Sequence, residues 1–335
     1  MTMDKQNKPP LIVILGPTAC GKTELSLAVA RRFDGEIISA DSMQVYRGMD
    51  IGTAKITPRE AGGIRHWLID VRDPDQGFSV AEFRQEAISC IEDVRRRGKR
   101  PILCGGTGLY VDSLLKIYHF PLQGEADPDI RRRLREELER DGAQALHQRL
   151  QTVDPEAAAR IHVNDSHRLI HALEVWESGG VALSQLWREP GQEPPYRSIC
   201  IGLLMARELL YQRIEQRVEG MLAQGLVEEV RRLLLAGVGE DAVAMQGLGY
   251  RQFLPYLRGE CDLAAAVDLL KRDTRRFAKR QLTWFKRNEE ITWFYRDHYR
   301  EEDALQRDVC ALISRRLKEG EGVEGIAGTI PEQLA

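Results

Sequence analysis

The sequence lacks the features that would place it in a secreted, membrane or metal-rich class of protein. Its six cysteines include no CxxC pair, which argues against a zinc site and against a disulfide framework. No apolar run approaches the roughly 20 residues that span a bilayer, and the start, MTMDKQNKPP, lacks the apolar core of a signal peptide. We therefore expect a cytoplasmic protein with reduced cysteines and no membrane contact.

An excess of positive charge is also missing. The formal net charge of −3 argues against a globally basic nucleic-acid binder, but it leaves room for a local basic surface. The 335 residues exceed one typical domain, and 43% hydrophobic with 30% charged residues is ordinary for a globular protein. The composition and length predict one large domain with an additional, smaller part.

What the sequence does contain is a phosphate-binding loop, ILGPTACGKTELSLAVA at residues 14–30. The pattern GxxxxGK(S/T) lies between an apolar strand and a helical segment, as such a loop requires. Gly16 and Gly21 let backbone N–H groups surround a polyphosphate. Lys22 adds a positive charge, and Thr23 offers a hydroxyl to a phosphate-bound magnesium ion. The motif predicts a diphosphate or triphosphate ligand without naming a reaction, because kinases, ATPases, GTPases and transferases can all use it.

Short apolar strands alternate with helical stretches in the first part of the chain. The pattern predicts an α/β fold, with a P-loop NTPase-like core and a mostly parallel sheet. The expected strands are LIVIL, EIIS, HWLIDV, PILCGG and SICIGLLM. Ligands bind at the carboxyl ends of such strands, so four loops are expected to converge on one crevice: residues 16–23, 40–44, 70–73 and 105–107.

The strand pattern stops between residues 120 and 195, where helical periodicity takes over. We interpret residues 120–195 as an inserted all-helical domain. Residues 11–119 and 196–317 then form the P-loop core with its C-terminal helices. Residues 1–10 are expected to be a disordered N-terminus, and residues 318–335, rich in Glu and Gly, a flexible tail.

Two further patterns leave alternatives open. Arg213 and Arg217 lie four residues apart on one expected helix face, where they could clamp a diphosphate. Ion pairs with Glu215, Glu219 or other acids on neighbouring turns explain the spacing equally well. The segment KRDTRRFAKRQLTWFKRN, residues 271–288, is rich in Lys and Arg with aromatics interleaved. It suits an RNA backbone, but it also fits a solvated basic helix whose aromatics, Trp284 among them, pack in the core.

Asp41 is the strongest candidate for a general base or a magnesium ligand. It follows the second expected strand, which brings its carboxylate to the crevice that faces the phosphate loop. The alternative is an ordinary surface aspartate. Asp70 and Asp73 are rivals, although an Asp-Pro pair more often caps a turn.

Several motifs together resemble those of the bacterial tRNA dimethylallyltransferases, also called tRNA isopentenyltransferases. They are GPTACGKT, DSMQVYRGMDIGTAK, RHWLIDVRDP, FSVAEFR, CGGTGLY, NDSHRLIHALEV, GLGYRQ and AKRQLTWFKR. The resemblance covers roughly residues 10–295. It implies transfer of a dimethylallyl group from dimethylallyl diphosphate to the exocyclic amine of the adenosine 3′ of the tRNA anticodon, with release of diphosphate.

The resemblance also implies roles for individual residues. Asp41 is the implied general base, with Lys22 and Thr23 as further catalytic residues. The donor diphosphate and its Mg²⁺ would be bound by Gly16, Pro17, Thr18, Ala19, Cys20, Gly21, Lys22 and Thr23, and by Arg213 or Arg217. The implied tRNA contacts are Asp41, Ser42, Met43, Gln44, Thr107, Asp127, Ser166, His167, Arg168, Leu169, Ile170, Gln246, Gly247, Leu248, Gly249, Tyr250, Arg251, Lys279, Arg280, Gln281, Leu282, Thr283, Trp284, Phe285 and Lys286.

The expected partners are the anticodon stem-loop of a tRNA and dimethylallyl diphosphate, and the chain is expected to act as a monomer. The target adenine must leave its stack to enter the crevice, and the free energy of unstacking is smallest when the base lies in a single-stranded loop. A P-loop nucleotide or small-molecule kinase is the main alternative, but it leaves the basic segment unexplained. The other is a non-catalytic RNA-binding protein whose loop senses nucleotide.

Overall fold

The computed structural model describes residues 8–116, 128–188 and 194–319. It divides into two compact units, which we describe separately: a core unit of Met1–Leu115 with Pro194–Ala335, and a helical unit of Lys116–Glu193. These boundaries lie within a few residues of the expected insertion at residues 120–195. Asp127 and most of the two expected tails lie outside the described residues.

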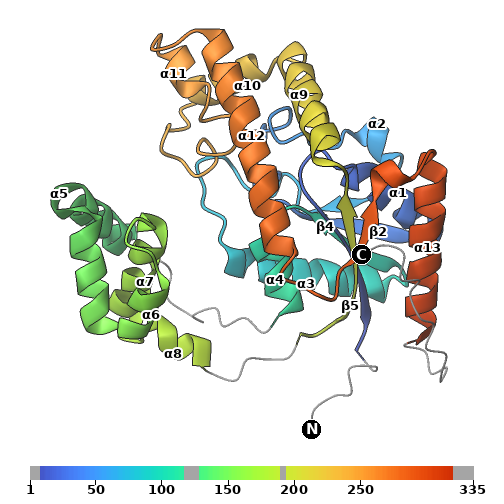
Figure 1. Ribbon diagram of the computed structural model, residues 1–335, viewed down its shortest axis with the longest axis horizontal. Coiled ribbons are helices and arrows are strands. Elements are labelled where there is room, and N and C mark those ends of the chain that lie inside the picture. Colours follow the sequence, from blue (N-terminus) through green and yellow to red (C-terminus); the bar gives the residue numbers. More distant parts are fainter. Residues whose placement is uncertain (1–7, 117–127, 189–193, 320–335) are drawn as a thin grey trace. The chain divides into compact units, whose positions relative to one another are not determined.

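One parallel sheet forms the centre of the core unit, in the strand order β3-β2-β4-β1-β5-β6 (Figure 1). The expected α/β fold with its parallel sheet is therefore confirmed. The strands are β1 (Pro10–Leu15), β2 (Gly35–Ala40), β3 (His66–Trp67), β4 (Arg100–Gly105), β5 (Arg197–Leu204) and β6 (Thr292–Tyr295).

Two strands differ from expectation. HWLIDV forms a strand over only two residues, because Leu68 and Asp70 have φ angles of 60° and 56° and the chain turns away from the sheet. The edge strand β6 was missed, because the sequence after residue 207 was interpreted as helical throughout. TWFY pairs with β5 over Ile201–Leu204 and extends the sheet by one strand.

Helices cover both faces of the sheet (Figure 1). Alternate residues of β1 point to opposite faces: Ile12 and Ile14 pack with α1, α9 and α13, whereas Leu11 and Val13 pack with α3 and α4. The helices of the core unit are α1 (Lys22–Phe33), α2 (Pro58–Ala61), α3 (Val80–Arg96), α4 (Gly108–Leu115), α9 (Arg207–Ala223), α10 (Leu226–Leu235), α11 (Leu254–Leu257), α12 (Leu263–Phe285) and α13 (Glu302–Glu319), with a 3₁₀ turn, η2, at Arg296–His298.

A further apolar cluster of the core unit joins the chain that follows β2 to the C-terminal helices. Val45, Tyr46 and Met49 are fully buried against residues of α9, α10 and the first half of α12. The polar segment DSMQVYRGMDIGT is thus anchored by apolar side chains between its polar ones. This cluster fixes the position of the loop that begins at Asp41.

The helical unit has its own core. Its helices are α5 (Pro128–Val153), α6 (Pro155–Arg160), α7 (Ser166–Gly179) and α8 (Leu183–Arg188). Leu134, Leu146, Leu150 and Leu169 are buried together, and Gly142, with a φ of 81°, interrupts α5. The absence of strands from the described part of this unit agrees with the expected all-helical insertion.

Candidate active site

The phosphate-binding loop lies between β1 and α1, as its sequence pattern predicts. Gly16, Ala19 and Gly21 have φ angles of 149°, 64° and 99°, so the backbone curls over the start of α1. Ala19 is a non-glycine residue in the left-handed region, a conformation that carries strain and is typical of functional loops. The carboxyl end of β1 and the amino end of α1 thereby form a cradle for an anion.

Two side chains of this loop are placed for phosphate chemistry. Lys22 donates a hydrogen bond from Nζ to the carbonyl oxygen of Pro17, at 2.8 Å, so its ammonium group lies over the loop. The Thr23 side chain is exposed at the first turn of α1. Cys20 is fully buried, and burial raises the pKa of its thiol. The cysteine therefore packs as a neutral side chain beneath the loop.

Both arginines of α9 lie at this loop. Arg213 donates from Nε to the carbonyl oxygen of Ala19, at 2.9 Å. Arg217 makes no hydrogen bond or ion pair with any described residue. Burial lowers the pKa of Arg217, while the charge of Asp41 acts in the opposite direction, so the guanidinium lies within electrostatic reach of the candidate base.

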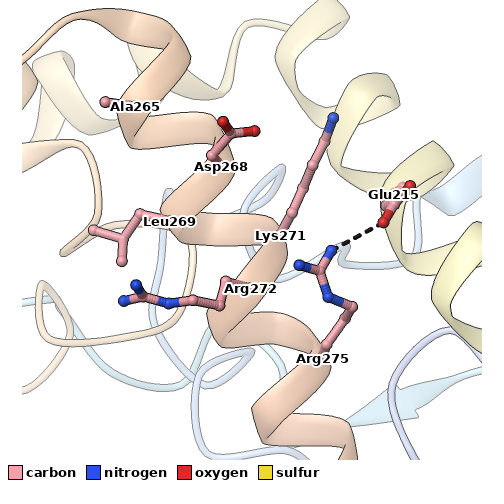
Figure 2. A pocket seen from close by; sticks show the side chains of 7 residues that line it. All are labelled: Glu215, Ala265, Asp268, Leu269, Lys271, Arg272 and Arg275. Atoms are coloured by element: carbon pink, nitrogen blue, oxygen red, sulfur yellow. Dashed lines mark hydrogen bonds and ion pairs between the residues drawn. The ribbon is translucent and has the colours of Figure 1, made fainter.

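The acids that might have neutralised these arginines pair with α12 instead. Arg275 and Glu215 form an ion pair of 2.9 Å in the hollow between α9 and α12 that Figure 2 shows. Lys271 pairs with Glu219 nearby. The ion-pair interpretation of Arg213 and Arg217 is therefore wrong for these two acids, and Arg213 contacts the phosphate loop instead.

Asp41 directly follows β2 and has one carboxylate oxygen anchored. Its Oδ1 accepts hydrogen bonds from the backbone N–H groups of Met43 and Gln44, at 2.9 and 3.3 Å. No described residue donates a hydrogen bond to Oδ2. One oxygen thus fixes the side chain while the other is available to accept a proton.

Thr107, from the turn after β4, holds the residue next to Asp41. Its Oγ1 accepts from the Ser42 N–H at 3.1 Å and donates to Ser42 Oγ at 3.3 Å. Its own N–H donates to the carbonyl oxygen of Ala40, at 3.1 Å. The ends of β2 and β4 are therefore joined at the site, as expected for loops 40–44 and 105–107.

The rest of the segment after Asp41 is held by groups far away in sequence. Glu229, 1% exposed on α10, accepts hydrogen bonds from the N–H groups of Asp50, Ile51 and Gly52, at 2.8 to 3.0 Å. It also accepts one from the Tyr250 hydroxyl, at 2.7 Å. Sequence reasoning missed Glu229, although an acid flanked by Leu226 and Leu233 at helical spacing on an apolar stripe was a usable signal.

The side-chain amide of Gln44 is already occupied. Ser39 Oγ donates to its Oε1 at 2.9 Å, and its Nε2 donates to the carbonyl oxygen of Thr53 at 3.2 Å. In the neighbouring segment GLGYRQ, Gln246 and Arg251 are exposed, whereas Gly247, Gly249 and Tyr250 are buried and Leu248 is partly buried. The exposed members are the ones whose side chains an RNA could reach.

The rival acids are engaged in ion pairs. Asp70 pairs with Lys55 at 2.5 Å, and Asp73 pairs with Arg47 at 2.8 Å. The Asp70 N–H does donate to the carbonyl oxygen of Gln44, so loop 70–73 adjoins loop 40–44 as expected. Among these three carboxylates, Asp41 is the one that is held by backbone N–H groups and forms no ion pair with a described residue.

The basic segment forms the second half of α12, which lies against α9 and α4 (Figure 1). Trp284 donates from Nε1 to Asp112 Oδ2, at 2.9 Å, and its ring packs against the apolar cluster beneath α3 and α4, in agreement with its expected place in the core. Gln281 and Phe285 are buried and Leu282 is partly buried. The exposed members of the expected tRNA-contact segment are Lys279, Arg280, Thr283 and Lys286.

In the helical unit, the candidate residues open α7. Asp165 caps this helix by accepting from the Arg168 N–H, at 3.3 Å. His167 and Arg168 are exposed and Ser166 is partly buried, but Leu169 and Ile170 are buried in the unit's own core. Their contact with tRNA stays a prediction.

Two kinds of feature are absent from the described residues. No group of three His, Cys, Asp or Glu side chains in these residues is arranged to hold a metal ion. None of the described helices is both long and apolar enough to span a membrane.

Comparisons with known proteins agree on one family. Residues 44–288 match the family model described as IPP transferase. A tRNA dimethylallyltransferase of Thermoanaerobacter sp. (strain X514) is 47% identical over 310 residues, which cover 92% of this chain and 98% of the relative.

Solved structures give the same result. The crystal structure of the full-length tRNA isopentenylpyrophosphate transferase from Bacillus halodurans is 44% identical, with a TM-score of 0.70, and the match covers 94% of this chain and 98% of that one. A eukaryotic dimethylallyltransferase acting on tRNA is 28% identical, with a TM-score of 0.77, over 95% of this chain and 81% of that one.

Proposed function

This chain belongs to the IPP transferase family, and from that premise we propose that it transfers a dimethylallyl group from dimethylallyl diphosphate to tRNA. The acceptor is the exocyclic amine of the adenosine 3′ of the anticodon, and diphosphate is released. The observation that carries the proposal is the unbonded Oδ2 of Asp41, within electrostatic reach of an arginine that lies at the phosphate loop. In this reaction the phosphate loop holds the departing diphosphate of the prenyl donor in place of ATP.

The donor diphosphate lies in the cradle at the start of α1. Backbone N–H groups of residues 19–23 and the Lys22 ammonium bind its oxygens. Arg217 binds it as well, because its guanidinium has no partner among the described residues, whereas Arg213 is occupied in holding Ala19. Arg217 therefore has all of its donors free for the ligand, whereas Arg213 has its Nε engaged with Ala19.

Mg²⁺ fits this site as an ion that arrives with the diphosphate. The exposed Thr23 hydroxyl lies where a phosphate-bound ion would need one oxygen ligand from the protein. A magnesium ion in such loops takes most of its ligands from phosphate and water, so no cluster of acidic side chains is needed. When bound, it would neutralise charge on the departing diphosphate.

Asp41 accepts the proton of the attacking amine. The lone pair of an adenine amine is delocalised into the ring, so proton removal as the carbon–nitrogen bond forms contributes roughly 10²–10⁴-fold to the rate. Lys22 and Arg217 stabilise the charge that develops on the diphosphate as the carbon–oxygen bond breaks. The electron pair of that bond leaves with the diphosphate, and the proton goes to Asp41 Oδ2.

The acceptor RNA is bound by the exposed basic residues of α12, and in the helical unit by the exposed start of α7. Lys279, Arg280 and Lys286 neutralise backbone phosphates, which makes binding dependent on salt. We further propose that the enzyme acts in the cytoplasm and that it acts as a monomer.

The test is incubation of the protein with Mg²⁺, unmodified tRNA and labelled dimethylallyl diphosphate, beside a labelled ATP control, followed by nucleoside analysis. We expect label on the adenosine next to the anticodon. Asp41→Asn should lose at least about 100-fold in rate, whereas Asp75→Asn, an exposed aspartate of the same unit, should retain full activity. ATP-dependent phosphorylation without prenyl incorporation would favour the kinase instead.

A further inference from the structure

Gln281 connects the two halves of the active site. It lies in the expected tRNA-contact segment of α12, but its side chain is only 6% exposed. Its Oε1 accepts a hydrogen bond from the Thr18 N–H of the phosphate loop, at 2.9 Å. Its Nε2 donates to the carbonyl oxygen of Gly106, at 3.0 Å. Both ends of one buried amide are therefore satisfied, one by each loop.

The Gly106 turn is shaped around this amide. A Cβ atom at position 106 would lie 2.2 Å from Gln281 Nε2, so only glycine leaves room for the contact. The next residue is Thr107, which holds Ser42 through its hydroxyl. A short chain of contacts thus runs from the phosphate loop through Gln281 and Thr107 to the residue beside Asp41.

The helix that carries Gln281 has two different faces. Ala278, Gln281 and Phe285 are buried on the inner face, whereas Lys279 and Arg280 are exposed. The inner face touches the protein loops that bind the donor and hold the base. A direct contact between the Gln281 side chain and RNA would require both of its hydrogen bonds to break.

We propose that Gln281 is a positioning residue that fixes the phosphate loop relative to Asp41. The inference rests on the proposed function, because it concerns the distance between the donor carbon and the amine that Asp41 deprotonates. A misplacement of about 1 Å can cost 10²-fold in rate without weakening the binding of either substrate. Gln281 therefore acts on kcat and leaves both KM values nearly unchanged.

The first test uses Gln281→Leu, which keeps the approximate size of the side chain and removes both hydrogen bonds. We expect kcat to fall about 10–100-fold, with KM for dimethylallyl diphosphate and for tRNA within about threefold of wild type. The matched control is Gln216→Leu, which changes an exposed glutamine on α9. This variant should keep the wild-type kcat and both wild-type KM values. An unchanged kcat, or a large rise in the KM for tRNA alone, would overturn the proposal.

The second test uses Gln281→Glu and distinguishes positioning from a loss of folding. An ionised glutamate can still accept from Thr18 but faces the Gly106 carbonyl oxygen without a proton to donate. A protonated glutamate makes both bonds, and burial raises the pKa of such a carboxyl. The ratio of variant to wild-type kcat should therefore rise as the pH is lowered from about 8 to about 6. A ratio independent of pH would overturn the proposal.

The two proposals fail in different ways. Wild-type protein that transfers no prenyl group refutes the proposed function itself. Wild-type protein that does transfer it, together with a fully active Gln281→Leu variant, refutes the positioning role alone. If Gln281→Leu melts well below wild type, its loss of turnover could reflect unfolding. The pH dependence of the ratio of Gln281→Glu to wild-type kcat then decides whether Gln281 has a positioning role.

Discussion

The donor side and the acceptor side of this active site are built differently. The donor side, residues 16–23, is continuous in sequence and forms its cradle from its own backbone, with Gln281 and Arg213 bonded to it from outside. The acceptor side, the loop that begins at Asp41, is held by Glu229 on α10 and by Thr107 after β4. Ile51 and Glu229 are 178 positions apart.

This difference has consequences for which substitutions matter. On the donor side, the groups that meet the ligand are mostly backbone N–H groups, so only a few side chains, Lys22 above all, should affect the reaction. On the acceptor side, the geometry depends on buried partners that touch no substrate. Substitutions far from the chemistry should therefore reduce turnover on the acceptor side.

Lys22→Ala should produce the largest effect on the donor side. We expect kcat to fall about 10²–10³-fold, because a positive charge aimed at the leaving diphosphate is lost. Single-turnover transfer rates and melting temperatures would be measured together, with Lys22→Arg as the variant that keeps the charge. A loss below about threefold would show that the backbone alone provides the donor side's catalytic effect.

Glu229→Gln should produce a smaller but clear effect on the acceptor side, through a residue that touches no substrate. Each carboxylate oxygen accepts two hydrogen bonds, so an amide nitrogen in place of one oxygen would face two donors. We expect a loss of about 1–3 kcal/mol in the free energy of unfolding. We also expect kcat/KM for tRNA to fall roughly tenfold, while the KM for the donor stays unchanged.

The adjacent Glu228 supplies the matched control for that prediction. Glu228 is exposed and makes only a 3.4 Å ion pair with Arg231, so Glu228→Gln should match wild type in stability and turnover. Equal losses in the two variants would mean that the charge of α10, and not the anchoring of residues 50–52, supports the acceptor side.

The same difference explains what the sequence could predict. The phosphate loop was predicted because its glycines, Lys22 and Thr23 are close in sequence and follow a strand. The position of Asp41 was predicted because parallel strands bring their carboxyl ends to one edge of the sheet. Both inferences need only local pattern and a general rule of topology.

Long-range partners were beyond such reasoning. Nothing local to Gln281 shows that its amide spans two loops, since its neighbours Lys279 and Arg280 are basic and exposed. The strand β6 was missed because four residues, TWFY, are too few to distinguish from a helix end by periodicity. The pairing of Glu215 with Arg275, and not with Arg213, follows from how α9 packs on α12, which spacing along one helix cannot show.

Arg217→Lys should produce a moderate effect that is confined to the donor side. A lysine keeps the charge but loses the planar fork that grips a diphosphate, so the KM for the donor should rise about fivefold. Arg213→Lys should instead lower the melting temperature, because Arg213 holds the carbonyl oxygen of Ala19. Titration of both variants with inorganic diphosphate would separate the roles, and equal affinities would contradict the assignment.

The smallest effect is expected from thiol reagents. Burial raises the pKa of Cys20, and it raises the pKa of Cys104 to about 11. A raised thiol pKa means that the protonated, unreactive form dominates below it, so at pH 7 roughly one Cys104 in 10⁴ is a thiolate. Iodoacetamide at pH 7 should leave prenyl transfer intact, and labelling of Cys104, followed by mass spectrometry, should accelerate about tenfold per pH unit. Rapid labelling of either cysteine at pH 7, with loss of donor binding, would contradict this expectation. It would show that the phosphate loop opens readily and that its backbone does not hold the donor side in shape.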